Sequence, residues 1–337
     1  MKRIVILDAI SPDAARRLET ETGWKVEERL KLTPAELPAA VEDADVLIVR
    51  SSTTLTAEVI AAARRLKVIG RAGIGVDNID MEAASERDIR VVNTPGATTT
   101  SVAELTIGAI LCLARWIHTA DASVRAGGWE RSTFQGIEVR GKLLGIVGLG
   151  RIGREVAKLA EALGMRVVAT DPYVESTPGG IAMTSLDDLL KRADFVSLHV
   201  PLDDDSQNLL DRDHLEMMKR GAYLLNFGRG GLIDEEVLAE LVERGHLAGV
   251  ALDTYAVEPP GATIDRLRKH PRTLLLPHLG AQTREGQIRV GMELVDGVVK
   301  AVKKTMQARA TALAEAREAE AEAAAAEASA EPAGGSE

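Results

Sequence analysis

The chain of 337 residues has little cysteine, no long apolar run and no block of basic residues. Its single cysteine, Cys112, excludes an intrachain disulfide, and such a chain suits a reducing cytoplasm. No stretch of about 20 consecutive apolar residues occurs, so a transmembrane helix is not expected. The 51 acidic and 41 basic side chains give a formal net charge of -10, which argues against nucleic-acid binding. We therefore expect neither a membrane nor a nucleic acid as a partner.

Two local features have ordinary structural explanations. Cys112 lies in the apolar run LTIGAILCLA, where a small buried hydrophobic residue is expected rather than a nucleophile. The segment MKRIVILDAI carries two cations and a short apolar stretch that Asp8 interrupts. This apolar stretch is too short for a signal peptide, so we predict a buried strand there.

Short apolar runs alternate with helical patterns along most of the chain. Runs of this length and composition are typical of parallel strands buried on both faces, and the helical segments between them predict βαβ units. The length exceeds what one hydrophobic core usually serves, so we expect two α/β domains. The predicted strands include RIVIL, DVLIVR, KVIGR, LLGIVG, RVVAT, FVSLHV, YLLNF, AGVALD and TLLLP.

A glycine-rich turn in mid-chain is the first functional motif. It reads Gly148-Leu149-Gly150-Arg151-Ile152-Gly153, with the apolar run KLLGIVG before it and the helical pattern REVAKLAEALG after it. Glycines at these positions permit a tight turn and a close approach of the backbone to a pyrophosphate, which the helix N-terminus attracts. The turn alone could be an ordinary packing turn, but the whole strand–turn–helix pattern predicts a dinucleotide site.

The next predicted strand, MRVVATD, ends in Asp171. A carboxylate at this distance from the turn can accept hydrogen bonds from both ribose hydroxyls of NAD and would repel the 2′-phosphate of NADP. We therefore predict NAD as the cofactor. Alternatively, Asp171 could cap a helix that begins at Pro172.

Three later segments, NFGRGG, ALDTYAVEPP and LPHLG, contain Arg229, Glu258 and His278. Reduction of a ketone leaves negative charge on its oxygen, which needs a proton donor, and histidine serves this purpose near neutral pH. Glu258 could orient His278, and Arg229 could hold a substrate carboxylate with its two-pronged guanidinium. Each residue taken alone also fits a structural or surface position. His199 and His214 show no acidic partner in the sequence and are weaker candidates.

The order and surroundings of these motifs resemble the D-isomer-specific 2-hydroxyacid dehydrogenases, most closely their phosphoglycerate dehydrogenase branch. The resemblance runs from about residue 5 to about residue 304 and implies an NAD-dependent oxidoreductase acting on a 2-hydroxy or 2-oxo acid. It also implies a flavodoxin-like substrate domain, 1–98 with 283–307, into which a Rossmann NAD domain, 99–282, is inserted. The alanine- and glutamate-rich tail, 308–337, is expected to be a solvated helix or disordered.

The resemblance assigns site residues by position. Arg229, Glu258 and His278 would be catalytic, and no metal is expected. The expected cofactor residues are Gly148, Gly150, Arg151, Ile152, Gly153, Asp171, Val200, Phe227, Gly228, Asp253 and Gly280. The expected substrate residues are Arg50, Arg71, Gly73, Ile74 and Arg131, where the arginines would bind the phosphate of 3-phosphohydroxypyruvate.

Several positions depart from the family pattern. Gly228 replaces the usual alanine or serine, and Thr254-Tyr255 replace valine and phenylalanine. Thr54-Leu55 stand where many relatives have Lys-Val, which removes one cation and leaves hydroxypyruvate, glyoxylate or another small 2-oxo acid as alternative substrates. A second alternative is an NAD-sensing corepressor of the same fold. The resemblance also implies a homodimer formed through the helix SVAELTIGAILCLAR and the arm around Trp129.

Overall fold

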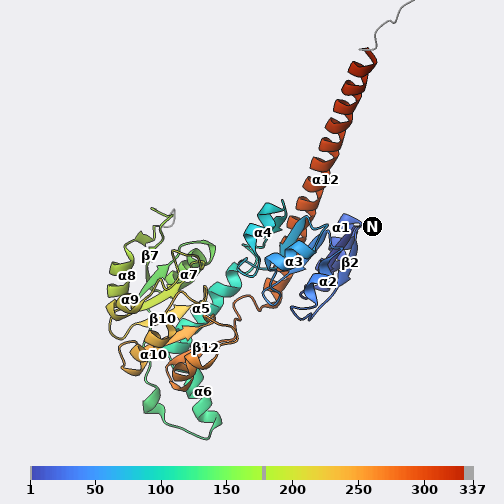
Figure 1. The fold of residues 1–337 in the computed structure, drawn as a ribbon. Helices are drawn as coiled ribbons and strands as arrows, with labels where there is room; N and C mark the ends of the chain where they lie inside the picture. The colour runs from blue at the N-terminus through green and yellow to red at the C-terminus, as the bar shows by residue number, and fades with distance from the viewer. Residues whose placement is uncertain (1, 177–179, 330–337) are drawn as a thin grey trace, which may run out of the picture. The chain divides into compact units, whose positions relative to one another are not determined.

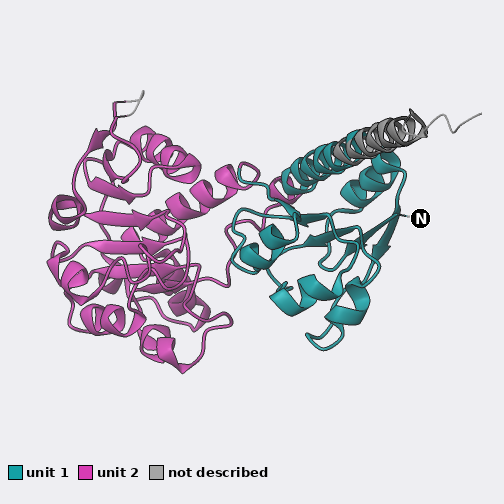
Figure 2. Ribbon diagram, turned by 45° about the horizontal axis from the view of Figure 1, so that its top comes forward, with its two compact units in different colours: residues 1–95, 288–337 teal, residues 96–287 magenta. Residues whose placement is uncertain are grey.

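The structure is a computed structural model, and it describes residues 2–176 and 180–329. The chain forms two compact units. Unit 1 comprises residues 1–95 and 288–337, and unit 2 comprises residues 96–287 (Figure 2). The chain thus leaves unit 1, completes unit 2 and returns, and it crosses between the units near residues 95 and 287 rather than near 98 and 282.

Unit 1 is built on a five-stranded parallel sheet in the order β2-β1-β3-β4-β5, which is the flavodoxin-like order. Its core contains the buried strand residues Val5, Leu47 and Ile69 together with Val59 and Ile60 of α3. Its elements are β1 (Arg3–Ile6), α1 (Pro12–Thr22), β2 (Lys25–Glu28), α2 (Leu37–Val41), β3 (Val46–Val49), α3 (Ala57–Ala62), β4 (Val68–Arg71), α4 (Met81–Glu86), β5 (Arg90–Val92) and the larger part of α12 (Arg284–Ser329).

Unit 2 is built on a seven-stranded parallel sheet in the order β12-β11-β10-β9-β6-β7-β8, which contains the Rossmann order. Its elements are α5 (Thr99–Ala114), α6 (Ile117–Arg125), η1 (Arg131–Phe134), β6 (Leu143–Val147), α7 (Arg151–Ala162), β7 (Arg166–Thr170), β8 (Ala182–Met183), α8 (Leu186–Arg192), β9 (Phe195–Leu198), α9 (Arg212–Met217), β10 (Tyr223–Asn226), α10 (Glu235–Glu243), β11 (Gly249–Leu252), η2 (Ala262–Ile264), α11 (Asp265–Lys269) and β12 (Thr273–Leu275).

Helices cover both faces of the unit 2 sheet. One core contains α5 and α7 residues such as Ile110 and Val156 packed on the strands. The other contains residues of α8, α9 and α10, among them Leu189, Leu215 and Leu238. The predicted α/β fold with two doubly wound parallel sheets is therefore confirmed. Polar N-caps fix where many helices begin, because a side-chain oxygen accepts an otherwise unpaired backbone N–H; these caps are Ser11, Thr56, Asp80, Ser185, Asp211 and Asp234.

Helix α12 begins at Arg284 and is one continuous helix to Ser329, well into the alanine- and glutamate-rich segment (Figure 1). The helical alternative predicted for the tail thus describes its backbone as far as Ser329, and the prediction for 330–337 lies outside the described residues. Within the described chain, no single helix has the length and hydropathy of a membrane span; α5 and α6 meet the criterion only as a pair bent by 64°.

Candidate functional site

The three segments with Arg229, Glu258 and His278 follow neighbouring strands of the unit 2 sheet. Strands β10, β11 and β12 are parallel and adjacent, so their carboxyl ends meet at one edge of the sheet. The glycine-rich turn and Asp171 follow β6 and β7 at the same edge. Ligands of open parallel α/β sheets bind at this edge, which places all of these predicted residues where a site is expected.

His278 and Glu258 form a direct pair. The Nδ1 atom of His278 lies 2.8 Å from Oε2 of Glu258, and the two side chains are 44% and 37% exposed. Glu258 is itself oriented, because its Oε1 accepts a hydrogen bond of 3.1 Å from the backbone N–H of Tyr255. With Nδ1 turned to the carboxylate, Nε2 of His278 is the ring nitrogen left to exchange a proton with a substrate.

Asp253 positions the His278 loop. It is 1% exposed, and its two carboxylate oxygens accept hydrogen bonds from the backbone N–H groups of Leu279 (2.7 Å) and Gly280 (2.8 Å). Burial raises the pKa of Asp253, and the two N–H donors oppose this rise. His278 itself has a φ of +54°, a conformation that histidine, asparagine and aspartate tolerate better than most residues. Asp253 and Gly280 were predicted as cofactor residues, and the structure gives them this positioning function.

Arg229 lies in a loop held by Asn226, the last residue of β10. The side-chain amide of Asn226 donates to the carbonyl of Arg229 (2.8 Å), and its oxygen accepts from the N–H of Gly228 (3.1 Å). Arg229 donates to the carbonyl of Gly228 (2.9 Å), and its side chain is half-buried. A Cβ on Gly230 would lie 1.8 Å from the carbonyl oxygen of Tyr255, so the Arg229 loop packs closely against the segment that leads to Glu258.

The glycine-rich turn has the shape that a dinucleotide requires. Gly148 has a φ of +92°, and a Cβ there would lie 2.7 Å from the carbonyl oxygen of His199. A Cβ on Gly153 would lie 2.2 Å from the carbonyl oxygen of Gly148, whereas Gly150 faces open space and is the N-cap of α7. The unpaired N–H groups in the first turn of α7, which include those of Arg151 and Ile152, therefore adjoin the free space beside Gly150. A pyrophosphate site needs this arrangement.

Asp171 is fixed beside this turn. Its Oδ2 accepts from the N–H of Leu149 (2.8 Å) and its Oδ1 from the N–H of Tyr173 (2.9 Å). Each carboxylate oxygen keeps a further lone pair for a ribose hydroxyl. The capping alternative is wrong, because the next described helix is α8, whose N-cap is Ser185. The residues present therefore fit NAD.

Replacing Gly153 with alanine is expected to lower the free energy of unfolding by about 1–3 kcal/mol, because the added Cβ meets a backbone oxygen that a rotamer change cannot move. Gly108→Ala in α5 is the matched control, since its Cβ would meet no atom within 4 Å. Chemical denaturation of both variants measures the difference. Equal stabilities would contradict the close packing of the turn against α7.

In unit 1, the predicted substrate loops are organised by two residues, Asp8 and Asn78, to which the sequence analysis gave no such function. Asp8, directly after β1, accepts from the backbone N–H groups of Arg50 (2.6 Å) and Thr53 (3.2 Å) and from the Thr53 hydroxyl (2.9 Å). The side chain of Asn78 donates to the carbonyls of Arg50 (2.7 Å) and Thr53 (2.5 Å). The only available signal was the position of Asp8 at the carboxyl end of a strand.

Arg71 and Gly73 lie at the same edge of the unit 1 sheet, at the end of β4. Gly73 has a φ of +151°, and a Cβ there would collide with the guanidinium of Arg71. Its carbonyl accepts from the N–H of Thr94 (2.9 Å), and the carbonyl of Ile74 accepts from the side chain of Asn93 (2.6 Å). Arg71 and Arg50 are half-buried.

The remaining predicted residues lie in varied environments of unit 2. Val200 is half-buried beside Gly148, Phe227 is 5% exposed and its side chain is part of the core, and Arg131 is exposed on η1. A Cβ on Gly228 would lie 3.1 Å from the carbonyl oxygen of Val200, so an alanine there would fit only after a small shift.

The other nucleophile and acid–base candidates are weaker. Cys112 is half-buried rather than buried, and burial raises the pKa of its thiol, which disfavours the reactive thiolate. His199 is bonded to the Ser197 hydroxyl (2.9 Å), and burial lowers its pKa to about 4. The expectation that His214 has no acidic partner is wrong, because its Nδ1 lies 2.7 Å from Asp211. That pair is at the start of α9, where Asp211 is the N-cap and also accepts from the backbone N–H of His214.

Comparison with known proteins agrees with this arrangement. Residues 107–280 match the NAD-binding domain of the D-isomer specific 2-hydroxyacid dehydrogenases. The chain is 44% identical over 311 residues to D-3-phosphoglycerate dehydrogenase of Methanocaldococcus jannaschii, and the match covers 90% of this chain but 58% of that protein. It is 43% identical over 299 residues to hydroxypyruvate reductase of Thermotoga maritima, covering 88% of this chain and 97% of that one.

The fold has a close counterpart among solved structures. The TT0316 protein of Thermus thermophilus superposes with a TM-score of 0.83 at 39% identity, and the match covers 90% of this chain and 97% of that one. The family model covers more than half of the sequence, and it contains the glycine-rich turn together with all three predicted catalytic residues. The chain therefore belongs to the D-isomer-specific 2-hydroxyacid dehydrogenase family.

Proposed function

We propose that this chain is an NAD-dependent oxidoreductase that interconverts 3-phosphoglycerate and 3-phosphohydroxypyruvate, the first step of serine biosynthesis. The observation that carries the proposal is the His278–Glu258 pair at 2.8 Å, on a strand end next to the Arg229 loop in an NAD-binding domain. When bound, NAD supplies the two-electron redox chemistry, and the protein supplies substrate binding and the proton.

Proton transfer is assigned to Nε2 of His278. In the direction of reduction, the imidazolium donates its proton to the substrate oxygen, where negative charge develops. In the direction of oxidation, the neutral ring takes the proton of the hydroxyl. Glu258 stabilises the imidazolium through Nδ1 in both directions, and the N–H of Tyr255 keeps the carboxylate oriented.

Arg229 is assigned to the substrate carboxylate. Its guanidinium can donate two parallel hydrogen bonds to a carboxylate, which fixes the orientation of the adjacent carbon and polarises its oxygen. The bonds of Asn226 to Arg229 and Gly228 hold the loop in one conformation, so less freedom is lost when substrate binds.

The substrate is inferred from unit 1 and from the relatives. Arg50, Arg71 and, on the arm of unit 2, Arg131 are the proposed phosphate ligands, and D-3-phosphoglycerate dehydrogenases are among the relatives. The chain spans 58% of the length of the first of these enzymes. A second candidate is hydroxypyruvate or a similar small 2-oxo acid, favoured by Thr54-Leu55 and by the full-length match to a hydroxypyruvate reductase.

Initial rates of NADH oxidation with 3-phosphohydroxypyruvate, hydroxypyruvate, glyoxylate and 2-oxoglutarate distinguish these candidates. We expect the largest kcat/KM for the phosphorylated acid, and a selective loss of that preference in Arg50→Gln. A larger kcat/KM for hydroxypyruvate would replace the proposed substrate while leaving the proposed chemistry in place. NADH binding with no turnover of any acid would contradict the enzyme and favour a cofactor-sensing protein.

Cofactor choice is assigned to Asp171. In Asp171→Ser, we expect the ratio of kcat/KM for NAD to that for NADP to fall by roughly 10- to 100-fold, because hydrogen bonds to a charged group contribute about 1.5–3 kcal/mol. Asp171→Asn removes the charge but keeps the turn, since its amide oxygen can still accept the hydrogen bond from the N–H of Leu149. An unchanged ratio in both variants would contradict this assignment.

A cytoplasmic homodimer is part of the proposal. Ile117 (54% exposed), Val124 (55%) and Trp129 (76%) present apolar surface on α6 and the following arm, as an interface would. The lone Cys112 suits a reducing compartment. Light scattering of the purified protein is expected to give twice the mass of one chain, and Trp129→Ser is expected to weaken the association. A monomeric mass at micromolar concentration would contradict the dimer.

A further inference from the structure

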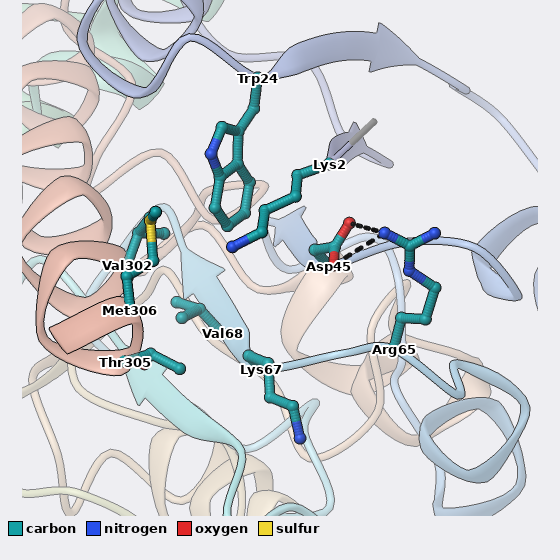
Figure 3. A pocket seen from close by; sticks show the side chains of 9 residues that line it. All are labelled: Lys2, Trp24, Asp45, Arg65, Lys67, Val68, Val302, Thr305 and Met306. Carbon is teal, nitrogen blue, oxygen red and sulfur yellow. Dashed lines mark hydrogen bonds and ion pairs between the residues drawn. The ribbon is translucent and has the colours of Figure 1, made fainter. Parts of the chain in front are cut away.

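A cavity of about 350 Å³ lies in unit 1, lined by the amino ends of strands and by one face of α12 (Figure 3). Asp45 immediately precedes β3, whereas Arg50 follows the same strand; Lys67 immediately precedes β4, whereas Arg71 ends it. The cavity is therefore at the opposite edge of the sheet from the predicted substrate loops. Its volume is within the range of small-molecule sites, roughly 300–1,000 Å³.

The parallel sheet brings the polar wall of the cavity together. Lys2, Trp24, Asp45 and Lys67 each stand directly before a strand, and these strands, β1 to β4, are neighbours. The register pairs Arg3 with Lys25, so Lys2 and Trp24 lie side by side. The Nζ atom of Lys2 is 4.8 Å from the centroid of the Trp24 ring, and Figure 3 shows both side chains directed into the same space.

Helix α12 supplies most of the apolar wall. Val302, Thr305 and Met306 line the cavity at the i, i+3, i+4 spacing, which places them on one face of the helix. Val302 is 3% exposed, whereas Met306 is 47% exposed, so part of this apolar side chain faces water. Val68, the first residue of β4, completes this apolar surface.

The charges in the cavity do not balance. The lining contains Lys2, Lys67 and Arg65 against one carboxylate, Asp45. Asp45 already accepts from the backbone N–H of Arg3 (2.9 Å) and from Arg65 (3.0 and 3.2 Å). Among the residues that the structure describes, Lys2 and Lys67 form no ion pair. The ammonium group of Lys2, which lies at the Trp24 ring, and that of the exposed Lys67 thus lack a counter-charge among these residues.

We propose that this cavity is a second ligand site, which binds a small organic carboxylate. The carboxylate would be held by Lys2 at the Trp24 ring and by Lys67 at the rim. The hydrocarbon body would contact Trp24, Val302 and Met306, which removes the exposed part of Met306 from water. Because α12 is the segment that returns to unit 1 from unit 2, an occupant would join the last helix to the strand ends of the sheet.

The test follows the indole N–H resonance of Trp24 in the 15N-labelled full-length protein, assigned by its loss in Trp24→Phe. Three probes separate the contributions: benzoate has charge and an apolar body, acetate has charge alone, and benzamide has the body alone. We expect saturable shifts with benzoate only. Saturation by benzamide or acetate at the same concentrations as benzoate, or no saturation by benzoate, would overturn the proposal.

Three variants test whether benzoate binds in this cavity. Lys2→Met is expected to weaken benzoate binding by roughly 10-fold, since it removes a charge-assisted hydrogen bond to the carboxylate. Thr305→Phe, which fills the cavity from a helix surface, is expected to abolish the shift. Lys158→Met is the matched control, because it removes an exposed lysine from α7 in unit 2. Binding that is equal in Lys2→Met and Lys158→Met would overturn the proposal.

Discussion

Replacing His278 with asparagine is expected to lower kcat by roughly 10²- to 10⁴-fold, the usual contribution of a general acid–base group. Asparagine is the informative replacement for two reasons. It tolerates the φ of +54° found at this position, and its amide can still bond to Glu258. The loop and the NADH affinity should therefore be preserved, so the lost rate reports the proton transfer.

His214→Asn is the matched control for this experiment. His214 also pairs with a carboxylate, at 2.7 Å from Asp211, but it lies at the start of α9 rather than at the strand ends. Its replacement should leave kcat within about twofold, since surface pairs contribute little. If His278→Asn and His214→Asn had the same kcat as the unmodified protein, His278 could not be the proton donor.

Replacing Arg229 with lysine is expected to lower kcat/KM for the 2-oxo acid by roughly 10- to 100-fold, because the charge remains but the two-pronged hydrogen bonding is lost. The Kd for NADH should not change, since the guanidinium is assigned to the substrate. Arg229→Gln should lower kcat/KM further. Steady-state kinetics with varied 2-oxo acid, together with NADH titration, separates the two effects.

Arg244→Lys is the control for Arg229→Lys. Arg244 is an exposed arginine that pairs with Glu240 on α10, and the same substitution there should leave kcat/KM unchanged. An Arg229→Lys protein with normal kcat/KM but weakened NADH binding would move Arg229 from the substrate to the cofactor.

Much of the fold could be predicted from the sequence, because buried parallel strands are continuous apolar runs. The nine predicted runs contain nine of the observed strands. The strands not predicted are β2, β5 and β8. Each is the last strand at an edge of its sheet, so one side lacks a partner and the residues are less buried; β2 reads KVEE, and none of its residues is fully buried.

For the site, the sequence predicted the residues that carry the chemistry but not the residues that position them. Glycine, arginine and histidine in fixed motifs identify the dinucleotide turn, Arg229 and His278, because each chemistry needs a particular residue type. By contrast, the sequence did not reveal which residues fix the loops around the site. Asp253, Asn78 and Asp8 bond to backbone N–H or carbonyl groups of segments that only the folded chain brings within reach. No local spacing in the sequence encodes those contacts.

Hydride transfer is tested most directly by following the label from NADH that carries deuterium at both C4 positions of the nicotinamide. The protein would be incubated with 3-phosphohydroxypyruvate or hydroxypyruvate, and the product examined by NMR. We expect a D-2-hydroxy acid that carries deuterium at C2, formed at a rate that falls in His278→Asn. Tight NADH binding without deuterium in any hydroxy acid would contradict it.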